Sequence, residues 1–287
     1  MLVVALVLEI CALTGYANLF RYLLHILAIR LELRKVMAIT LSGLAVSHVF
    51  SAGGVGGWIV SYNALRRKEV PHGLVFVAIA SQQFFNYVVL WILFFVAMIF
   101  LVVTGASSIW AYATATLLIL LMLGLVTYGI YLYNHRSKMR RRVSQIARLI
   151  NKLARREVIG EDHIDGWLDN LFVGMRRMTT HHGAFRTTVA YACVYWLFDM
   201  LCLWVTFFAF GYHMPLERLA IGYVIAYSVG TLAPTPGGLG AIEGLLVALY
   251  IGFDAPSAIA VATVLTYRVI NFWLPIPPGL IAYMTVR

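Results

Sequence analysis

A segment rich in proline and glycine interrupts an apolar stretch and reads Pro234-Thr235-Pro236-Gly237-Gly238-Leu239-Gly240. Proline donates no backbone hydrogen bond, and glycine permits positive φ and a close approach of other groups. We therefore expect one helix to end at this break and another to begin after Gly238, with Glu243 in its first turn. The N–H groups and positive dipole end of such a helix bind anions, so this break is a candidate phosphate site.

A second glycine-rich segment, SAGGVGGW from Ser51 to Trp58, has the same character. A constant 184 residues separates the two sets of glycines: Gly53, Gly54 and Gly56 correspond to Gly237, Gly238 and Gly240. We expect the two breaks to line one substrate-binding site from opposite sides. The alternative is that the glycines only let helices pack closely, but the prolines on both sides of Thr235 argue against it.

Charged side chains within apolar runs are the other candidates. Asp199 lies in the middle of the run 186–210, and Arg268 lies well inside the last apolar run. Charges at membrane depth are costly and usually functional. Arg268 can pair with Glu243 or Asp199, or hold a phosphate through two parallel hydrogen bonds, and Asn271 can donate to the same group. The alternative is a buried ion pair that only fixes helix register, and for Asn271 an equal alternative is a hydrogen bond between helices.

Motifs for metal, nucleotide or covalent chemistry are absent from the sequence. Its eight His and three Cys residues lack the spacing of zinc ligands, and it contains neither a P-loop nor a serine nucleophile elbow. We therefore expect no metal, no cofactor and no nucleic-acid partner. ATP-driven pumping by this chain alone also has no motif to support it.

The composition indicates which elements must position these residues. Of the 287 residues, 62% are apolar and 12% are charged, about half the roughly 25% of charged residues in soluble domains. This balance excludes the soluble and disordered classes. It indicates an all-α polytopic membrane protein with a single membrane domain, 1–287.

Five apolar runs are long enough to cross roughly 30 Å of hydrocarbon: 2–29, 73–103, 109–133, 186–210 and 256–285. The stretches 36–65 and 219–252 contain the glycine breaks, and each half is too short to cross alone. The simplest interpretation is two re-entrant hairpins, whose irregular backbone must be buried in protein or line a wet cavity. The chain then divides into repeat one (1–103), a connecting span (109–133), a basic insert (134–185) and repeat two (186–287).

Basic residues predict the orientation. Nineteen of the 22 Lys and Arg residues fall in 30–35, 66–68, 134–186 and at Arg287, whereas the opposite loops contain only Arg218. Because basic loops face the cytoplasm, we expect a multi-pass protein of the cell membrane with its N-terminus outside and its C-terminus in the cytoplasm. The first hairpin then enters from the cytoplasm and the second from outside, so the two repeats are inverted.

The insert predicts two amphipathic helices. Apolar residues recur at steps of three and four: Met139, Val143, Ile146, Ile150 and Leu153, and then Ile164, Trp167, Leu171, Met175 and Met178. The opposite face of the first helix holds Arg140, Arg141, Arg148 and Arg155. Basic amphipathic helices lie on anionic membranes, so we expect residues 137–178 to contact an anionic lipid surface. Packing of the two helices on one another as a cytoplasmic cap is an equal and compatible alternative.

Three motifs resemble those of the transmembrane region of lysylphosphatidylglycerol synthases/flippases and its stand-alone relatives: AGGVGGW at 52–58, PTPGGLGAIEG at 234–244, and Arg268 with Asn271-Phe272-Trp273-Leu274-Pro275. The pattern covers nearly the whole chain, and its second motif is more specific than its first. In that family the membrane region is associated with moving an aminoacylated phospholipid between leaflets, while a separate soluble domain makes the lipid. The sequence has no such soluble domain, so the resemblance does not imply lipid synthesis here.

These features favour a lipid translocator for a phosphate-bearing headgroup. The residues expected to hold the headgroup are Gly237, Gly238, Gly240, Glu243, Arg268, Asp199 and Asn271 from one side and Gly53, Gly54 and Gly56 from the other. A polyprenyl-phosphate or glycolipid carrier is the nearest variant. The alternatives are a non-transporting membrane partner of a lipid-modifying synthase and an intramembrane lipid transferase with Glu243 or Asp199 as base. A homo-oligomer or a synthase partner is compatible with each.

Overall fold

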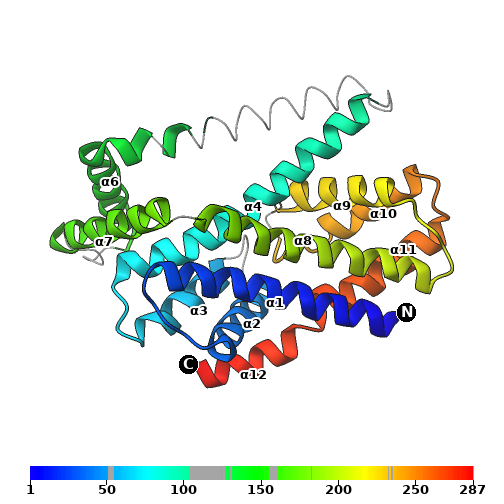
Figure 1. The fold of residues 1–287 in the computed structure, drawn as a ribbon, viewed down its shortest axis with the longest axis horizontal. Helices are drawn as coiled ribbons and strands as arrows, with labels where there is room; N and C mark the ends of the chain where they lie inside the picture. The colour runs from blue at the N-terminus through cyan, green and yellow to red at the C-terminus, as the bar shows by residue number, and fades with distance from the viewer. Residues whose placement is uncertain are drawn as a thin grey trace.

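The computed structural model describes residues 1–50, 55–103, 124, 127–129, 131–154, 161–181, 183–231, 233 and 235–286. The regular secondary structure of these residues is all helical, so the predicted all-α fold is confirmed for them. Figure 1 shows the helices packed as an elongated bundle. Most of the expected span 109–133 lies outside the described residues, as do Gly53 and Gly54.

Four helices in the described part of the chain are long and apolar enough to cross a membrane. They are α1 (Leu2–Ile26), α4 (His72–Val103), α8 (Ala184–Ala209) and a composite helix over Ser257–Thr285. At 1.5 Å per residue, the 25 residues of α1 extend roughly 37 Å, more than the roughly 30 Å of a bilayer core. Four of the five predicted spans are therefore present as helices.

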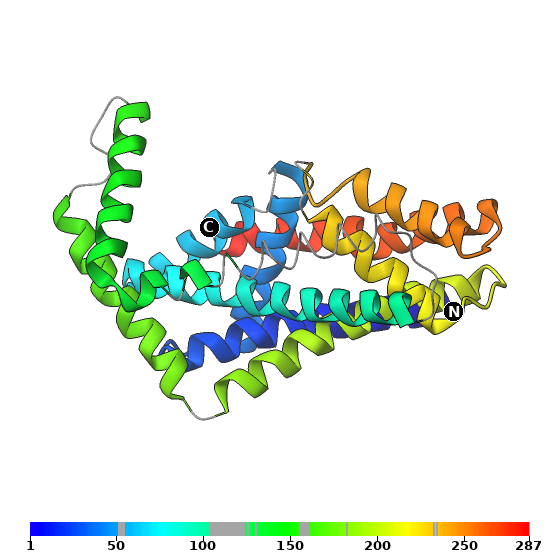
Figure 2. The same ribbon diagram turned by 90° about the horizontal axis from the view of Figure 1, so that it is seen from above.

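Helices α1 and α8 run side by side (Figures 1 and 2), and small residues permit their close approach. Ala12 and Ala17 of α1 and Ala192 of α8 are fully buried. A Cβ atom on Gly15 would lie only 2.9 Å from Cγ1 of Val194. This pairing joins the first helix of each repeat that the sequence predicts, and it holds the two halves of the chain together.

Two pairs of shorter helices flank the glycine breaks: α2 (Leu33–Phe50) with α3 (Val55–Arg66), and α9 (Leu216–Gly230) with α10 (Ala241–Gly252). The members of each pair pack on one another. Figure 1 places α2 and α3 toward the end of the molecule that carries α7, and α9 and α10 toward the other end, where the N-terminus lies. The helices therefore end at the segments that the sequence predicts as breaks.

The composite helix changes its winding in the middle. It consists of α11 (Ser257–Arg268), the π-helix η1 (Val269–Trp273) and α12 (Ile276–Val286). The N–H of Leu274 donates to the carbonyl of Val269 at 2.8 Å, one residue further back than in an α-helix. Pro275, Pro277 and Pro278 have no N–H to continue the regular ladder, which explains the interruption. Single π-turns of this kind occur frequently at functional sites.

The basic insert contains α6 (Arg136–Ala154) and α7 (Glu161–Thr180), which run across one end of the bundle in Figure 2. Both predicted amphipathic helices are therefore present. Buried Ile164, Leu168 and Leu171 of α7 belong to a hydrophobic core shared with α2, α3 and α4. Gly73 of α4 lies so close to α7 that a Cβ atom would be 2.5 Å from the carbonyl oxygen of Trp167. Protein of the bundle thus covers the apolar face of α7.

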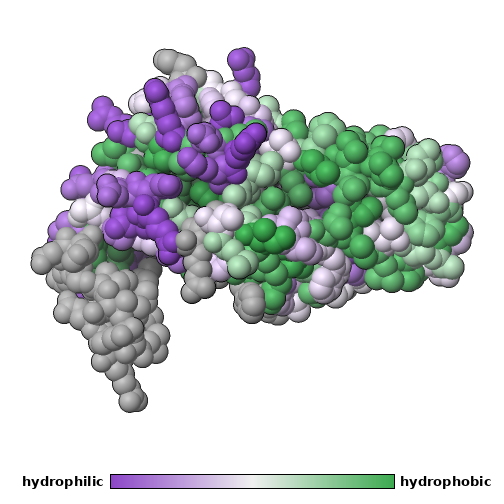
Figure 3. Space-filling view, turned by 90° about the horizontal axis from the view of Figure 1, so that it is seen from below, coloured by the Kyte–Doolittle hydropathy of each residue, from purple (hydrophilic) through white to green (hydrophobic). Residues whose placement is uncertain are grey.

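The surface distinguishes the two ends of the molecule. In the view of Figure 3, hydrophilic residues gather at the end that holds α6 and α7, and most of the remaining length is hydrophobic. Exposed apolar side chains on α1, α4 and α8 include Val7, Phe84 and Leu197. Such a wide apolar surface needs a bilayer around it. Together with the four long apolar helices, it identifies a multi-pass membrane protein.

Candidate functional site

Arg268 and Glu243 form an ion pair inside the bundle. The distance from Arg268 Nε to Glu243 Oε1 is 2.6 Å, and the side chains are 4% and 16% exposed. The second carboxylate oxygen, Oε2, accepts the N–H of Gly240 at 2.8 Å, so Glu243 caps its own helix, α10. The ion pair that the depth of Arg268 predicts is present. A carboxylate occupies the helix N-terminus, where the sequence predicts an anion.

Further contacts fix the guanidinium of Arg268. Nη2 donates to the carbonyl oxygen of Gly237 at 3.3 Å, and Nη1 donates to Oδ1 of Asn271 at 3.3 Å. The guanidinium carbon lies 4.5 Å from the centroid of the Phe272 ring, within range of a cation–π contact. Arg268 therefore joins three of the residues named from the sequence: Gly237, Glu243 and Asn271.

The backbone of the second break requires glycine. Gly237, Gly238 and Gly240 have φ values of +56°, +70° and +81°, which L-residues adopt only with strain. A Cβ atom on Gly238 would lie 2.7 Å from Cδ1 of Ile242 and 3.1 Å from the carbonyl oxygen of Gly230, whereas one on Gly240 would have no neighbour within 4 Å in the part of the chain that the structure describes. The open space beside the break therefore lies at Gly240, while protein fills the space at Gly238.

Asp199 is fully buried on α8 and accepts several hydrogen bonds. The hydroxyl of Tyr223 donates to Oδ2, the hydroxyl of Tyr267 lies 2.9 Å from both oxygens, and Asn271 Nδ2 donates to Oδ1 at 2.7 Å. The hydroxyls of Tyr227 and Tyr267 are hydrogen-bonded to each other. Three donor groups of this kind satisfy an ionised carboxylate.

The amide of Asn271 connects Asp199 to Arg268. Its Nδ2 donates to Asp199 and also to Oε1 of Glu9 at 3.3 Å, while its Oδ1 accepts from Arg268 and, at 3.3 Å, from Tyr227. Glu9 comes from α1 and is 2% exposed. One side chain on the π-turn therefore links two carboxylates to the buried cation.

Sequence reasoning places a charge at Glu9 in the first span but assigns neither Glu9 nor the three tyrosines to this network. Glu9 is an acidic residue inside an apolar run, which is the same signal that singled out Asp199. Tyr223 and Tyr227 are spaced by four residues, so they share one face of α9. Tyr223 and Tyr267 donate to Asp199, and Tyr227 is hydrogen-bonded to Tyr267, so the cluster joins α8, α9 and α11. Periodicity along one segment does not reveal it.

The first break contributes the end of α2. The imidazole of His48 stacks on Phe272, and its Nδ1 lies 3.1 Å from the carbonyl oxygen of that residue. A Cβ atom on Gly237 would be 3.2 Å from Cδ2 of His48. Gly56 is buried in the first turn of α3. The last turn of α2 therefore lies against the π-turn and the second break.

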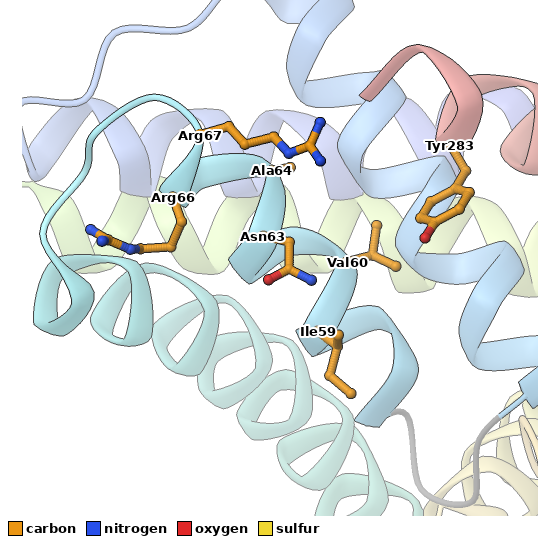
Figure 4. Close-up of a pocket in the computed structure, with 7 residues that line it drawn as sticks. All are labelled: Ile59, Val60, Asn63, Ala64, Arg66, Arg67 and Tyr283. Atoms are coloured by element: carbon orange, nitrogen blue, oxygen red, sulfur yellow. The ribbon is translucent and has the colours of Figure 1, made fainter. Parts of the chain in front are cut away.

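Two cavities lie at the basic end of the molecule. One, of about 460 Å³, lies between α3 and α12 (Figure 4). Its lining residues are Ile59, Val60, Asn63, Ala64, Arg66, Arg67 and Tyr283. The other, of about 450 Å³, is lined by segments 27–31 and 68–71 and by Arg177, whose Nη1 donates to the carbonyl oxygen of Leu27 at 2.7 Å. The three basic segments of the chain therefore meet at one end.

Ion pairs join the two helices of the insert. Arg140 binds Asp165 through two hydrogen bonds, Nε–Oδ1 at 2.6 Å and Nη2–Oδ2 at 2.8 Å, and Arg136 pairs with Asp169. The hydrogen bonds and charge of Arg140 hold the pKa of Asp165 below its ordinary value. Among the described residues, no group of three or more His, Cys, Asp or Glu side chains is arranged to hold a metal ion.

Comparison with known proteins gives one family match. Residues 1–279 match the family described as "Lysylphosphatidylglycerol synthase TM region", which confirms the resemblance found in the motifs. A UPF0104 membrane protein of Methanocaldococcus jannaschii is 22% identical over 289 residues, 99% of this chain and 84% of the relative.

Two UPF0104 membrane proteins of Methanothermobacter thermautotrophicus are also similar. One is 28% identical over 156 residues, which are 52% of this chain and 46% of the relative. The other is 22% identical over 284 residues, which are 96% of this chain and 80% of the relative.

Proposed function

Because the chain belongs to the family of the lysylphosphatidylglycerol synthase transmembrane region, we propose that it moves a lipid with a phosphate-bearing headgroup between the two leaflets of the membrane. A phospholipid is the principal candidate, and a polyprenyl phosphate or glycolipid is the nearest variant. The tails stay in the bilayer while the headgroup passes through the protein. The family gives a lipid-related role, and the site described above supports the transport step.

The position of the Glu243 carboxylate carries this proposal. It accepts hydrogen bonds from Arg268 and from the N–H of Gly240, at the N-terminus of a helix and next to open space. These are donors that bind a phosphate oxygen well. The headgroup displaces Glu243, so that Arg268 is paired both before and after binding. An exchange of partners avoids leaving a bare charge at membrane depth.

The two pairs of short helices provide the pathway. We interpret them as inverted re-entrant hairpins, with α2 and α3 entering from the cytoplasm and α9 and α10 from outside. Half-helices that meet near the midplane are typical of alternating-access transporters. Gly237, Gly238 and Gly240 then present backbone groups to the headgroup from one side, and Gly53, Gly54 and Gly56 from the other. In this arrangement the N-terminus is outside and the C-terminus is cytoplasmic.

The basic end of the molecule provides the attraction to lipid. Arg66 and Arg67 line the cavity between α3 and α12 (Figure 4), where an anionic headgroup of the cytoplasmic leaflet can bind. The basic face of the insert, residues 137–178, lies on the anionic membrane surface, while the apolar face of α7 packs on the bundle. The network of Asp199 and Asn271 positions Arg268 during the exchange.

Purified protein in liposomes tests the proposal. A fluorescent phosphatidylglycerol is added to preformed proteoliposomes, and an external reductant then bleaches the probe that remains outside. Wild-type protein should move a growing fraction of the probe to the inner leaflet, where the reductant cannot bleach it. Arg268→Ala should abolish this protection. Arg21→Ala is the matched control, because Arg21 is an exposed arginine of a spanning helix.

The outcomes separate the alternatives. Protection equal to that of empty liposomes contradicts translocation and favours a partner of a lipid-modifying synthase. A chemical change of the recovered lipid, seen by mass spectrometry, favours an intramembrane transferase. Protection that is unaffected by Arg268→Ala contradicts the site.

A further inference from the structure

The buried network contains more acids than bases. Glu9, Asp199 and Glu243 face a single guanidinium, that of Arg268, within one chain of hydrogen bonds. Glu243 is paired with Arg268 at 2.6 Å, so its charge is compensated. Asp199 and Glu9 remain, and both are almost completely buried. Two ionised carboxylates without a counter-ion are not tolerated at membrane depth.

The hydrogen bonds distinguish the two remaining carboxyl groups. Both oxygens of Asp199 accept bonds, from two tyrosines and one amide, which is a full set of donors for an ionised group. Glu9 accepts one long bond at 3.3 Å through Oε1, while Oε2 is buried and has no hydrogen-bond partner among the described residues. A protonated carboxyl is neutral and can donate from that oxygen. The arrangement therefore fits an ionised Asp199 beside a protonated Glu9.

We propose that Glu9 is a proton-binding site coupled to the lipid site, so that a proton and the phosphate-bearing lipid move together. This inference rests on the proposed function and identifies its driving force. Asn271 is the physical link, because its amide group donates to Glu9 and Asp199 while its oxygen accepts from Arg268. A phosphate on Arg268 adds negative charge to the network and favours a proton on Oε2 of Glu9.

Thermodynamic linkage makes the coupling reciprocal. The protonated form of Glu9 binds the anionic headgroup more tightly than the ionised form, and headgroup binding in turn draws a proton from water. The proton leaves when the network opens to the opposite side. Other titratable or charged groups around the two carboxyls are Tyr195 and Cys202 on α8, Tyr223 and Tyr227 on α9, Glu243 on α10, and Tyr267 and Arg268 on α11. Of the three carboxyl groups in the network, that of Glu9 accepts the fewest hydrogen bonds from donors that hold an ionised form.

The first test measures lipid distribution in proteoliposomes under an imposed pH difference. With one proton per lipid, a difference of one pH unit should hold a fluorescent phosphatidylglycerol at about a tenfold excess in one leaflet, since one pH unit is a tenfold ratio of proton activity. Glu9→Gln keeps the neutral shape of the protonated carboxyl. This variant should give equal amounts of the fluorescent lipid in the two leaflets at any pH difference. Glu9→Asp should retain part of the response. Glu217→Gln, at an exposed position in the first turn of α9, is the matched control.

A second measurement does not depend on transport. Short-chain phosphatidylglycerol is added to purified protein in weakly buffered detergent solution with a pH indicator. Wild-type protein should take up protons as lipid binds, and Glu9→Gln should bind lipid without taking up protons.

The two measurements separate the inference from the proposed function. Wild-type protein that moves lipid with no response to pH, and binds lipid with no proton uptake, overturns the proton site and leaves translocation standing. Wild-type protein that neither binds nor moves lipid overturns both. Proton uptake that persists in Glu9→Gln assigns the proton to another group and overturns the role of Glu9.

Discussion

The imidazole of His48 stacks on the ring of Phe272, with ring centroids 4.1 Å apart and an angle of 17° between the planes. The guanidinium of Arg268 lies 4.5 Å from the centroid of the same ring, within range of a cation–π contact. Phe272 is 1% exposed. One aromatic ring of the π-turn thus joins the end of α2 to the residue that we propose holds the headgroup.

We expect the His48–Phe272 stack to contribute measurably to stability. His48→Ala removes the stack, which is worth about 0.5–1.5 kcal/mol beyond its buried area, while His48→Phe keeps an aromatic ring at the same place. Thermal unfolding in detergent should therefore show a lower midpoint for His48→Ala than for His48→Phe. Equal midpoints for the two variants would mean that the end of α2 is held by other contacts.

Removing one partner of the Arg268–Glu243 pair should be costlier than removing both. Glu243→Ala leaves a buried guanidinium with only carbonyl and amide acceptors, and a stranded buried charge costs about 3–5 kcal/mol. The double variant Arg268→Ala/Glu243→Ala leaves neither member of the pair without its partner and should be more stable than either single variant. Thermal unfolding of the four proteins provides this double-mutant cycle. Additive losses would contradict the coupling, and the pair Arg218–Asp254, which is partly exposed, supplies the comparison.

The glycines at 238 and 240 should respond differently to substitution. At both positions the backbone has a positive φ, which costs any residue with a side chain roughly 1–2 kcal/mol. At 238 the side chain also meets Ile242 and the carbonyl of Gly230, so Gly238→Ala should unfold at a lower temperature than Gly240→Ala. Gly240→Leu should keep the melting temperature of Gly240→Ala and lose lipid movement, because its side chain fills the proposed headgroup space. Wild-type rates in Gly240→Leu would show that the headgroup lies elsewhere.

The sequence predicts much of this site because charge and glycine carry strong physical constraints. The cost of a bare cation at membrane depth is enough to predict a partner for Arg268, and the glycine breaks mark the helix ends. The sequence does not predict that protein fills the space beside Gly238. A helical side chain leans toward the N-terminus of its helix, so Ile242 lies over the turn before it and occupies the space that the sequence leaves open.

Other features depend on how separate helices meet. Glu9, Tyr223 and Tyr267 lie on α1, α9 and α11. The tyrosines are ordinary residues of their segments, and Glu9 stands out in its own only as an acid inside an apolar run. Only the packing of these helices brings them to Asn271 and Asp199. The π-turn was predictable in principle, because the three prolines after Trp273 remove the donors that an α-helix needs.

Acid should loosen the contact between α6 and α7. The pKa of Asp165 is lowered in the folded protein by Arg140, so its contribution to docking is present above the pKa of the unfolded chain, roughly 3.9, and is lost as pH falls through the lowered value. In an Asp169→Asn background, spin labels at Gln145→Cys and Gly166→Cys should show a distance distribution that is narrow at pH 7 and broad in acid. Adding Asp165→Asn to this background should give a broad distance distribution both at pH 7 and in acid. A distribution in the Asp169→Asn protein that stays narrow in acid would show that apolar contacts alone hold α6 to α7.

The last prediction concerns which side of the membrane each end of the molecule faces. Lys68 and His213 are exposed residues, one in the basic turn between α3 and α4 and the other in the loop between α8 and α9. These two connections lie at opposite ends of the bundle in Figure 1. Because basic loops stay in the cytoplasm, a membrane-impermeant maleimide should label His213→Cys on intact cells and Lys68→Cys only in inverted vesicles. Cys11, Cys193 and Cys202 must first be replaced, since Cys193 is exposed. Labelling of both positions from the same side would contradict the inverted hairpins, and with them the proposed alternating-access pathway, while labelling of each from the opposite side to that expected would keep the hairpins and reverse the orientation.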